Sequence, residues 1–385
     1  MKILYITPNS IYENSGGGIE TKKIITSINN LQNRYNKFKF YTISNDNKNS
    51  HGVKLLLKKN FRKDIAARFL YHSTYLFMEW NKIKHAIKTI NPDVLILGNS
   101  RLGFIAKKVN KMKLNCFIIV HFHNIEYDYL EAYSLKFNKI SSKIFNLIEK
   151  NCVKNDESSA IENMDLGLFL TKRDVTRAEN IYKSSFNYNV LPICIEKFQK
   201  KLNSKNKYNI NLVFLGSLWY GSNTDGILWF LDEVWKKLDI KENKINLIIG
   251  GSKPSEKFIN NLKKYDNITL YKNFKLKANI IPKNSFFISP IQKGAGMKVK
   301  VAEALSMGLG IIGSRESLIG YHEAINDSLN KDVIFEANKP EEYIDIIKLL
   351  LKEKPFDKIK KNALQLHQKY YSIKRAESSI ENILK

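Results

Sequence analysis

The sequence predicts an α/β protein made of two Rossmann-like, doubly wound domains. Three observations carry this prediction. Short β-rich runs alternate with longer helical periods along the chain, which is typical of parallel sheets. The alternation begins again at Ile210, so two such series follow one another. The 385 residues also exceed the size at which one hydrophobic core stops growing.

The first series supplies five strands and five helices. The predicted strands are Lys2–Thr7, Lys39–Ser44, Asp93–Leu97, Cys116–His121 and Leu166–Leu170. The predicted helices are Ile19–Leu31, Ser73–Ile90, Leu102–Lys111, Ser141–Asn163 and Arg173–Tyr182. Ligands of such sheets bind at the carboxyl ends of the strands, which directs the search for a site to those positions.

The second series repeats the arrangement. Its predicted strands are Asn211–Leu215, Asn246–Gly250, Thr269–Lys272, Ser285–Ser289 and Gly310–Gly313. Its predicted helices are Thr224–Leu238, Ser255–Lys264, Lys298–Met307, Glu341–Lys352 and Phe356–Lys369. We expect an N-terminal domain over 1–190, a polar linker over 191–207 and a C-terminal domain over 208–369. A last helix, in 370–385, is expected to rejoin the first domain.

The chain is strongly basic, with a formal net charge of +26. Residues 1–195 carry +14 and the remainder +12, so the charge is spread rather than gathered in one arm. This positive charge either forms an ordinary solvated surface or attracts anionic lipids or phosphorylated substrates. Binding to nucleic acid ranks third, because no recognised binding motif accompanies the charge. Residues 51–69 form a basic amphipathic stretch, either an ordinary surface helix or a membrane-surface contact.

The cysteines and the chain start favour a cytoplasmic protein. Cys116, Cys152 and Cys194 show no paired or metal-like spacing, which a reducing compartment explains best. The N-terminus runs directly into a strand pattern without the apolar core of a signal peptide. No stretch approaches the ~20 apolar residues of a membrane span. We therefore expect a cytoplasmic protein, with peripheral contact to the inner face of the membrane left open.

A glycine-rich loop follows the first strand. Gly16, Gly17 and Gly18 come between Ser15 and a helical period that begins at Ile19. Glycines there allow close approach to a ligand, and a helix N-terminus offers free N–H groups to an anion. The loop matches neither the dinucleotide fingerprint nor a P-loop, and a plain tight turn also explains it.

Two histidines stand where the fourth strand of the first series ends. His121 and His123 are two residues apart and would point the same way on a strand. Zinc is considered, but no third ligand of suitable spacing accompanies them. His123 is better read as a hydrogen-bonding or proton-handling group facing a cleft, or as a structural histidine bonded to backbone.

The most informative segment is a glycine turn that leads into a helix. Gly294, Ala295 and Gly296 precede Met297 and the helical run from Lys298 to Gly308. Lys300 and Glu303 are three residues apart and share a helix face. The ammonium could offset phosphate charge while the carboxylate accepts from two ribose hydroxyls. An exposed Lys–Glu pair is the alternative.

The run GAGMKVKVAEALSMGLGIIGS, together with Phe214–Ser217, the glycine loop and His123, resembles the retaining family 4 glycosyltransferases of the GT-B fold. Within these it is similar to the bacterial branch that builds capsule, O-antigen and other surface polysaccharides. The resemblance implies two facing Rossmann-like domains, the second of which binds a nucleotide-sugar donor. It also implies a glycan or polyprenyl-linked acceptor.

The resemblance assigns roles to individual residues. Glu303 would bind the donor ribose, whereas a phosphate role for Lys300 or Lys298 is our inference from the absence of the family's usual cations. The backbone N–H groups of Gly294–Met297 would face donor sugar or phosphate, and Ser217 would lie near the cleft. Gly17 and Gly18 would approach the diphosphate, and His123 would lie beside the transferred sugar. We expect His123, Lys300 and Glu303 to be the catalytic residues.

Two departures from the family pattern stand out. The family often has two glutamates separated by seven residues, and here the position of the first is occupied by Ala295, while Glu303 matches the second. The family also often has Arg and Lys after the first strand of the second domain, and the segment Gly216–Asn223 contains neither. We expect hexosyl transfer with retention of configuration and without a divalent metal or other cofactor. The alternatives are a nucleotide-sugar 2-epimerase of the same fold and a non-catalytic partner subunit resembling a glycosyltransferase.

Overall fold

A computed structural model describes residues 1–10, 12–13, 15–44, 57, 60–134, 140–199, 207–274, 279–353 and 356–385. The chain forms two compact units. Unit 1 comprises Met1–Cys194 and Ile373–Lys385, and unit 2 comprises Ile195–Ser372. No described helix is long and apolar enough to cross a membrane.

Unit 1 is built on a parallel sheet with six strands in its described part, in the order β2-β1-β3-β4-β5-β6. The strands are β1 (Lys2–Ile6), β2 (Lys39–Ile43), β3 (Val94–Leu97), β4 (Phe117–Phe122), β5 (Leu166–Phe169) and β6 (Tyr188–Val190). The strand order reverses between β1 and β3. Loops at the carboxyl ends of these strands therefore diverge there, leaving room for a ligand.

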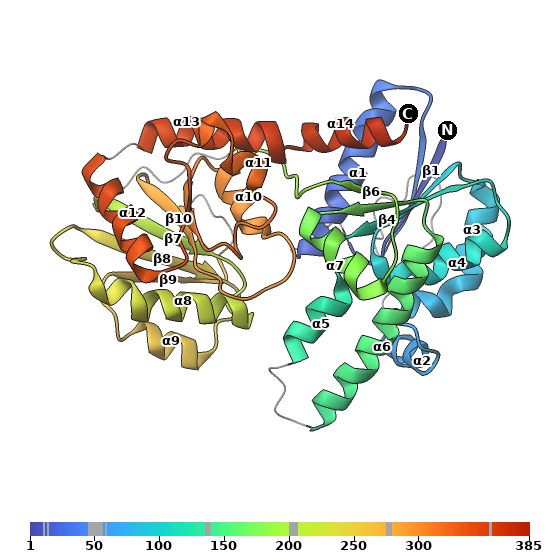
Figure 1. The fold of residues 1–385 in the computed structure, drawn as a ribbon, viewed down its shortest axis with the longest axis horizontal. Helices are drawn as coiled ribbons and strands as arrows, with labels where there is room; N and C mark the ends of the chain where they lie inside the picture. The colour runs from blue at the N-terminus through green and yellow to red at the C-terminus, as the bar shows by residue number, and fades with distance from the viewer. Residues whose placement is uncertain are drawn as a thin grey trace. The chain divides into compact units, whose positions relative to one another are not determined.

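Helices cover both faces of this sheet (Figure 1). They are α1 (Gly16–Arg34), α2 (Phe61–Phe69), α3 (Trp80–Ile90), α4 (Gly103–Lys111), α5 (Glu126–Ser134), α6 (Ile140–Asn163), α7 (Lys172–Tyr182) and α14 (Ile373–Ile383). Alternate residues of β1 point to opposite faces. Leu4 and Ile6 pack with α3 and α4, whereas Ile3 and Tyr5 pack with α1 and α14. The C-terminal helix thus belongs to the core of unit 1.

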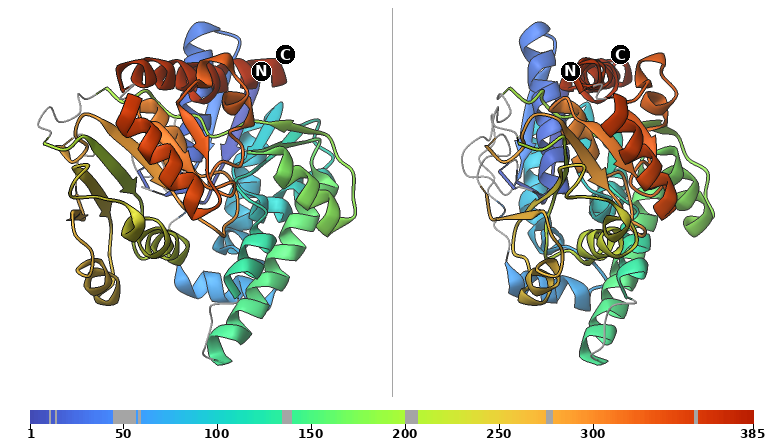
Figure 2. Two further views of the ribbon diagram at one scale, coloured as in Figure 1. Left: turned by 60° about the vertical axis from the view of Figure 1, so that its left-hand side comes forward. Right: turned by 90° about the vertical axis from the view of Figure 1, so that its left-hand side faces the viewer.

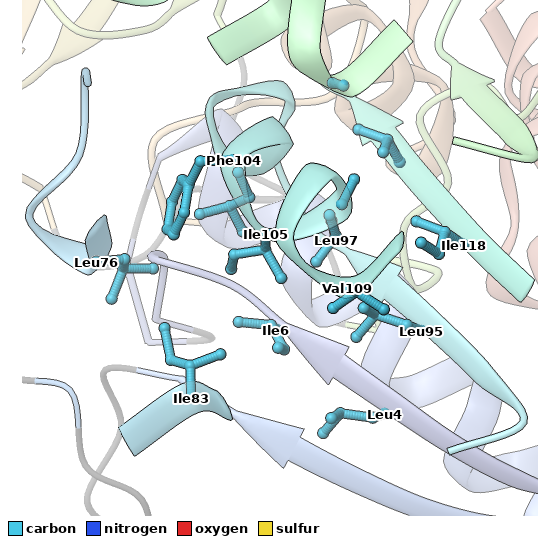
Figure 3. Packing of buried hydrophobic residues seen from close by; sticks show 14 of the residues in the cluster. Leu4, Ile6, Leu76, Ile83, Leu95, Leu97, Phe104, Ile105, Val109 and Ile118 are labelled. Carbon is cyan, nitrogen blue, oxygen red and sulfur yellow. The ribbon is translucent and has the colours of Figure 1, made fainter. Parts of the chain in front are cut away.

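Figure 3 shows the first of these cores from close by. Its members are aliphatic or aromatic and almost wholly buried, and include Leu4, Ile6, Leu95, Leu97, Phe104, Ile105, Val109 and Ile118. Burying such side chains contributes roughly 1.5–3 kcal/mol each. This packing holds β1, β3 and β4 in register, and so fixes the loops that follow them.

Unit 2 repeats the architecture with a second parallel sheet, six strands in the described ranges, ordered β12-β11-β10-β7-β8-β9. The strands are β7 (Ile210–Leu215), β8 (Ile245–Gly251), β9 (Ile268–Lys272), β10 (Ser285–Ser289), β11 (Gly310–Gly313) and β12 (Ile334–Glu336). The helices are α8 (Gly221–Glu233), α9 (Glu256–Leu262), α10 (Val299–Ser306), α11 (His322–Ile325), α12 (Pro340–Glu353) and α13 (Phe356–Leu366). Here the order reverses between β7 and β10.

The predicted helix over Ser73–Ile90 is wrong in its first part. Ser73 donates from its N–H and its hydroxyl to the buried carboxylate of Asp156, which holds the chain extended. A 3₁₀ turn over Tyr75–Glu79 follows before α3 begins. The predicted helix over Phe356–Lys369 ends at Leu366 and gives way to a π turn.

Several short elements were not predicted. They are β6, β12, α5 and α11; β6, β12 and α11 are too short for their periodicity to stand out, and the apolar periodicity of α5 is weak. Residues 61–69 of the basic amphipathic stretch form α2, whereas residues 51–56 and 58–59 lie outside the described residues.

Candidate functional site

The strongest candidate site in unit 2 lies where its strand order reverses. Gly216 and Ser217 follow β7, and the turn Gly294–Gly296 follows β10, the strand hydrogen-bonded to β7. The carboxyl ends of neighbouring parallel strands meet at one edge of a sheet. The topology therefore brings together two segments that lie almost eighty residues apart.

Lys298 holds the glycine turn in place. Its ammonium donates to the carbonyl oxygens of Ala295 (3.1 Å) and Gly296 (2.9 Å), and to Oε1 of Glu316 (3.0 Å). These three acceptors match the three donors of an ammonium group. Gly296 has a φ of +61°, a conformation that residues with a side chain rarely adopt. The predicted phosphate role of Lys298 stays a prediction, and the contacts described are those of a group that shapes the turn.

A tyrosine secures the start of α10, the helix that carries the Lys–Glu pair. The hydroxyl of Tyr321, which is fully buried, accepts from the N–H of Ala302 (3.0 Å) and donates to the carbonyl of Lys298 (2.8 Å). One otherwise unpaired N–H of the first helical turn is thereby satisfied. Met297, just before the helix, is buried.

Lys300 lies at the centre of the site. Its ammonium donates to Oδ1 of Asn223 and lies 4.7 Å from the ring centroid of Phe214, at the end of β7. Asn223 in turn donates to the carbonyl of Ser217 (2.8 Å). Lys300 is half-buried, and a single described hydrogen bond leaves ammonium donors available to an anion.

The electrostatic setting of Lys300 favours the neutral amine. Burial and then the nearby Lys298 ammonium lower the pKa of Lys300 from 10.5 to about 7, although Glu303 acts in the opposite direction. A lysine in this state gains strongly from an anion, because the anion stabilises the charged form. Strongly shifted pKa values are typical of functional sites.

This pKa shift predicts that Lys300 destabilises the fold. The unfolded chain holds a proton that the folded chain lacks between pH 7 and 10.5. The free energy of unfolding should therefore rise with pH over that window through this group. Replacing Lys300 by methionine should raise the melting temperature, most at pH values below 7, where the buried charge costs most. Melting curves of both proteins across the pH range check this, and an equal gain at every pH would contradict it.

Glu303 lies one helical turn after Lys300 and is half-buried. The two side chains share a face of α10, as their spacing predicts. Ser217 is also half-buried, at the end of β7. Of the site residues predicted in unit 2, Ser217 and Lys300 are therefore linked through Asn223, which the sequence analysis did not single out.

Unit 1 carries the other predicted residues at the ends of β1 and β4. Ser15 caps α1 by accepting from the N–H of Gly18 (3.1 Å). A Cβ on Gly18 would come within 2.2 Å of the carbonyl oxygen of Glu13, so only glycine fits there. Gly17 lies against the side chain of Asn9. The glycines thus have a local structural reason, and their predicted approach to a diphosphate stays a prediction.

His123 lies directly after β4 and is 6% exposed. Its Nε2 is buried with no hydrogen-bond partner among the described residues. Its ring meets that of His121 edge to face, with centroids 4.6 Å apart. A buried polar atom without a partner is costly, which points to a ligand or water at this position.

His121, which contacts His123, belongs to a buried charged cluster with Glu20 and Lys23 that the sequence analysis missed. Oε2 of Glu20, on α1, is 2.5 Å from the ammonium of Lys23 and 3.1 Å from Nε2 of His121. Lys23 also donates to the carbonyls of Leu191 (3.3 Å) and Pro192 (3.0 Å). Glu20, Lys23 and His121 are at most 2% exposed.

The protonation states follow from this arrangement. Burial raises the pKa of Glu20, but Lys23 and His121 outweigh it, and the pKa falls to about 2. Burial and then the neighbouring His121 lower the pKa of His123 to about 3. The pKa of His121 is lowered as well, mainly by burial. Glu20 is therefore charged and both imidazoles are neutral at physiological pH.

The signal for this group was present but ambiguous. Glu20 and Lys23 are three residues apart on α1, a pattern usually found on solvated helix faces. Only their position on the buried face, beside Thr21 and Ile24, distinguishes them. In the parts of the chain that are described, no group of three or more His, Cys, Asp or Glu could hold a metal ion.

Comparison with known proteins adds independent information. Residues 209–353 match the family described as glycosyl transferases group 1. An uncharacterized 44.6 kDa protein in the cps region of Klebsiella pneumoniae is 26% identical over 275 residues, covering 68% of this chain and 67% of that protein.

Solved structures resemble the chain over its whole length. Sucrose-phosphate synthase from Thermosynechococcus elongatus has a TM-score of 0.66 at 9% identity, covering 100% of this chain and 98% of that chain. Anabaena Alr3699/HepE in complex with UDP has a TM-score of 0.58 at 11% identity, covering 100% and 99%. These matches confirm the predicted two-domain α/β fold as GT-B and, with the family match, support a glycosyltransferase of the GT-B type.

Proposed function

We propose that this GT-B-type glycosyltransferase transfers a sugar, most simply a hexose, from a nucleoside-diphosphate donor to a glycan or polyprenyl-linked acceptor. One observation carries the proposal. A half-buried lysine, Lys300, lies at the β7–β10 switch point next to Gly216, on the helix that follows the Gly294–Gly296 turn, and makes a single described hydrogen bond. Backbone N–H groups and an ammonium at such a point suit a diphosphate.

The proposed reaction transfers a glycosyl group from the nucleoside diphosphate to an acceptor hydroxyl. The bond between the anomeric carbon and the diphosphate oxygen breaks, and the acceptor hydroxyl oxygen forms the new bond. The hydroxyl proton passes to the departing diphosphate. Lys300 and turn N–H groups stabilise the charge that develops on the leaving group, and Glu303 accepts hydrogen bonds from the ribose.

His123 is assigned to the transferred sugar. Its neutral ring offers a hydrogen bond through the buried Nε2, which supports the sugar while positive charge develops on it. Retention of the anomeric configuration, with attack from the face of the leaving group, is part of the proposal through the family resemblance. The transfer is proposed to need no divalent metal or other cofactor.

The setting of the reaction is also proposed. The relative from the cps region supports a part in the synthesis of a bacterial surface polysaccharide or glycoconjugate. A polyprenyl-linked or growing glycan acceptor places the protein in the cytoplasm, at the inner face of the membrane. The UDP bound in the Anabaena structure makes UDP-sugars the first donors to test.

The test is an assay with labelled UDP-, GDP-, ADP- and TDP-sugars, with and without glycan acceptors extracted from surface polysaccharide. The expected result is labelled product only when acceptor is present, with the anomeric configuration of the donor kept and activity resistant to a chelator. Epimerised nucleotide-sugar without any acceptor would identify a 2-epimerase instead. Nucleotide binding without turnover would identify a non-catalytic partner subunit.

Glu303 gives a prediction about nucleotide affinity. Replacing it by alanine removes the acceptor assigned to two ribose hydroxyls, and hydrogen bonds to a charged group contribute about 1.5–3 kcal/mol. The dissociation constant for the nucleotide should rise about 10–100-fold, measured by calorimetry. Glu303→Gln, which keeps one acceptor oxygen, should lose less. An unchanged dissociation constant in the alanine variant would remove Glu303 from the ribose site.

A further inference from the structure

One surface of unit 1 exposes large apolar side chains at high density. Seventeen large hydrophobic residues are exposed among those described, and ten of them fall within 61–78 and 144–148. They are Phe61, Ile65, Phe69, Leu70, Tyr71 and Met78, with Ile144, Phe145, Leu147 and Ile148 from α6. Scattered apolar residues need no explanation, but a gathering of this kind marks an interaction site. We refer to these ten residues as the apolar face.

The face on α2 has the pattern of an interfacial helix. Phe61, Ile65 and Phe69 are four residues apart and so share one side of the helix, opposite the buried Ala67. Phe61 is 77% and Phe69 81% exposed. Arg62 lies beside them on the exposed side.

The second part of the face is the N-terminal half of α6. Figures 1 and 2 show this end of α6 extending away from the sheet of unit 1, with α2 beside it. Phe145 and Leu147 are 55% and 59% exposed there. A projecting helix whose exposed side is apolar gains nothing from water and would gain from burial in another medium.

The two parts are joined by specific contacts. Arg68 of α2 donates to Oε2 of Glu149 (2.6 Å), and its guanidinium lies 5.7 Å from the ring centroid of Phe145. Asn155 of α6 donates to the carbonyl of Tyr71 (2.9 Å). The apolar face is therefore held together as one surface rather than as two independent helices.

The charges around the face are complementary to anions. Arg62 and Lys143 are exposed and have no acidic partner among the described residues. Acids on these elements and beside them are already paired, Asp64 and Glu149 with Arg68, Glu79 with Lys63 and Lys82, and Glu131 with Lys150. Among the described residues, this apolar surface thus carries two exposed cations without an acidic partner, which fits an apolar layer whose rim is anionic.

We propose that the apolar face docks this protein on a bilayer that contains anionic phospholipid. The aromatic and aliphatic side chains enter the boundary between headgroups and acyl chains, and Arg62 and Lys143 contact lipid phosphates. The proposed function puts the protein at the inner face of the membrane through its acceptor, whereas this inference names the docking surface and requires neither donor nor acceptor. It also reaches past the basic stretch over 51–69, since four of the ten residues of the apolar face lie on α6.

The test is co-sedimentation of the full chain with vesicles of equimolar phosphatidylglycerol and phosphatidylcholine, and with phosphatidylcholine alone. The parent should bind the anionic vesicles, less at high salt, and bind the neutral ones weakly. The double variant Phe61→Ser/Phe69→Ser should lower the partition coefficient at least about tenfold on both. Arg62→Glu/Lys143→Glu should lower it about tenfold on anionic vesicles only.

Matched controls come from unit 2, where Leu349 and Lys257 are also exposed. Leu349→Ser and Lys257→Glu should bind vesicles like the parent. All variants should keep the parent's melting temperature and nucleotide affinity, which separates docking from the donor site. Failure of the parent to bind anionic vesicles would overturn the proposal. So would a parent dimer that the phenylalanine variant converts to monomer without any vesicle binding, since the face would then join two copies of this chain.

Discussion

Replacing Lys300 by alanine should slow sugar transfer by about 10²–10³-fold, because one preorganised donor to a developing oxyanion contributes about that much. The ammonium is the group proposed to offset charge on the leaving diphosphate. The melting temperature should not fall, since the alanine variant no longer buries a lysine whose pKa is lowered to about 7. Initial rates at saturating donor, with melting curves, check both parts.

Lys300→Arg is the matched variant, and pH separates it from the parent. In the parent, a free-protein pKa of about 7 means that donor affinity should fall as pH rises above 7, because a proton must be taken up to form the ion pair. Arginine stays protonated throughout this range, so its affinity should hardly change with pH. A parent affinity that is flat from pH 6 to about 9 would contradict the phosphate role of Lys300.

Replacing His123 by alanine should lower turnover about 10²-fold and leave nucleotide affinity nearly unchanged. The reason is that His123 is assigned to the sugar rather than to the nucleotide. Its pKa of about 3 predicts that no loss of rate between pH 6 and 7 arises from protonating this ring. Steady-state rates across pH and calorimetry with free nucleotide measure the two effects.

Glu20→Gln tests whether the buried charged cluster of Glu20, Lys23 and His121 positions His123. The change keeps the shape but removes the charge that faces Lys23 and His121. Turnover should fall, and the unpaired Lys23 should lower stability by about 3–5 kcal/mol, as expected when a buried pair is broken. The double variant Glu20→Gln/Lys23→Met should recover stability without recovering turnover. Recovery of both stability and turnover would show that Glu20, Lys23 and His121 have a purely structural role. For His123→Ala, a large loss of nucleotide affinity would instead assign His123 to nucleotide binding.

The sequence predicted the fold well because periodicity is a local property. Strands such as β7 and β10 are short apolar runs bounded by turn residues, and helices such as α4 and α12 carry an apolar stripe that is buried. The errors occur where distant contacts override local preference. The extended segment before Tyr75 is held by Asp156, more than eighty residues away.

In the candidate site of unit 2, too, local patterns were predictable from the sequence and contacts between distant residues were not. The pairing of Lys300 with Glu303 on one helix face depends on three-residue spacing and was predictable. The contact of Lys300 with Asn223 was not, because 77 residues separate them and only the pairing of β7 with β10 brings them together. The phosphate role of Lys298 stays a prediction, and its contact with Glu316 was not predicted, because the sequence does not indicate that this acid lies nearby.

The central claim is that unit 2 binds a nucleotide-sugar donor at the β7–β10 switch point. The most direct measurement is the melting temperature of the parent and of Glu303→Ala with UDP-, GDP-, ADP- and TDP-sugars and the free nucleotides. Ligand at 100 times its dissociation constant stabilises the folded state by about 2.7 kcal/mol. We expect the melting temperature to rise by about 5 °C or more with ligands of one base, and this rise to be largely lost in Glu303→Ala. No rise with any of these ligands at millimolar concentration, for well-folded parent protein, would contradict it.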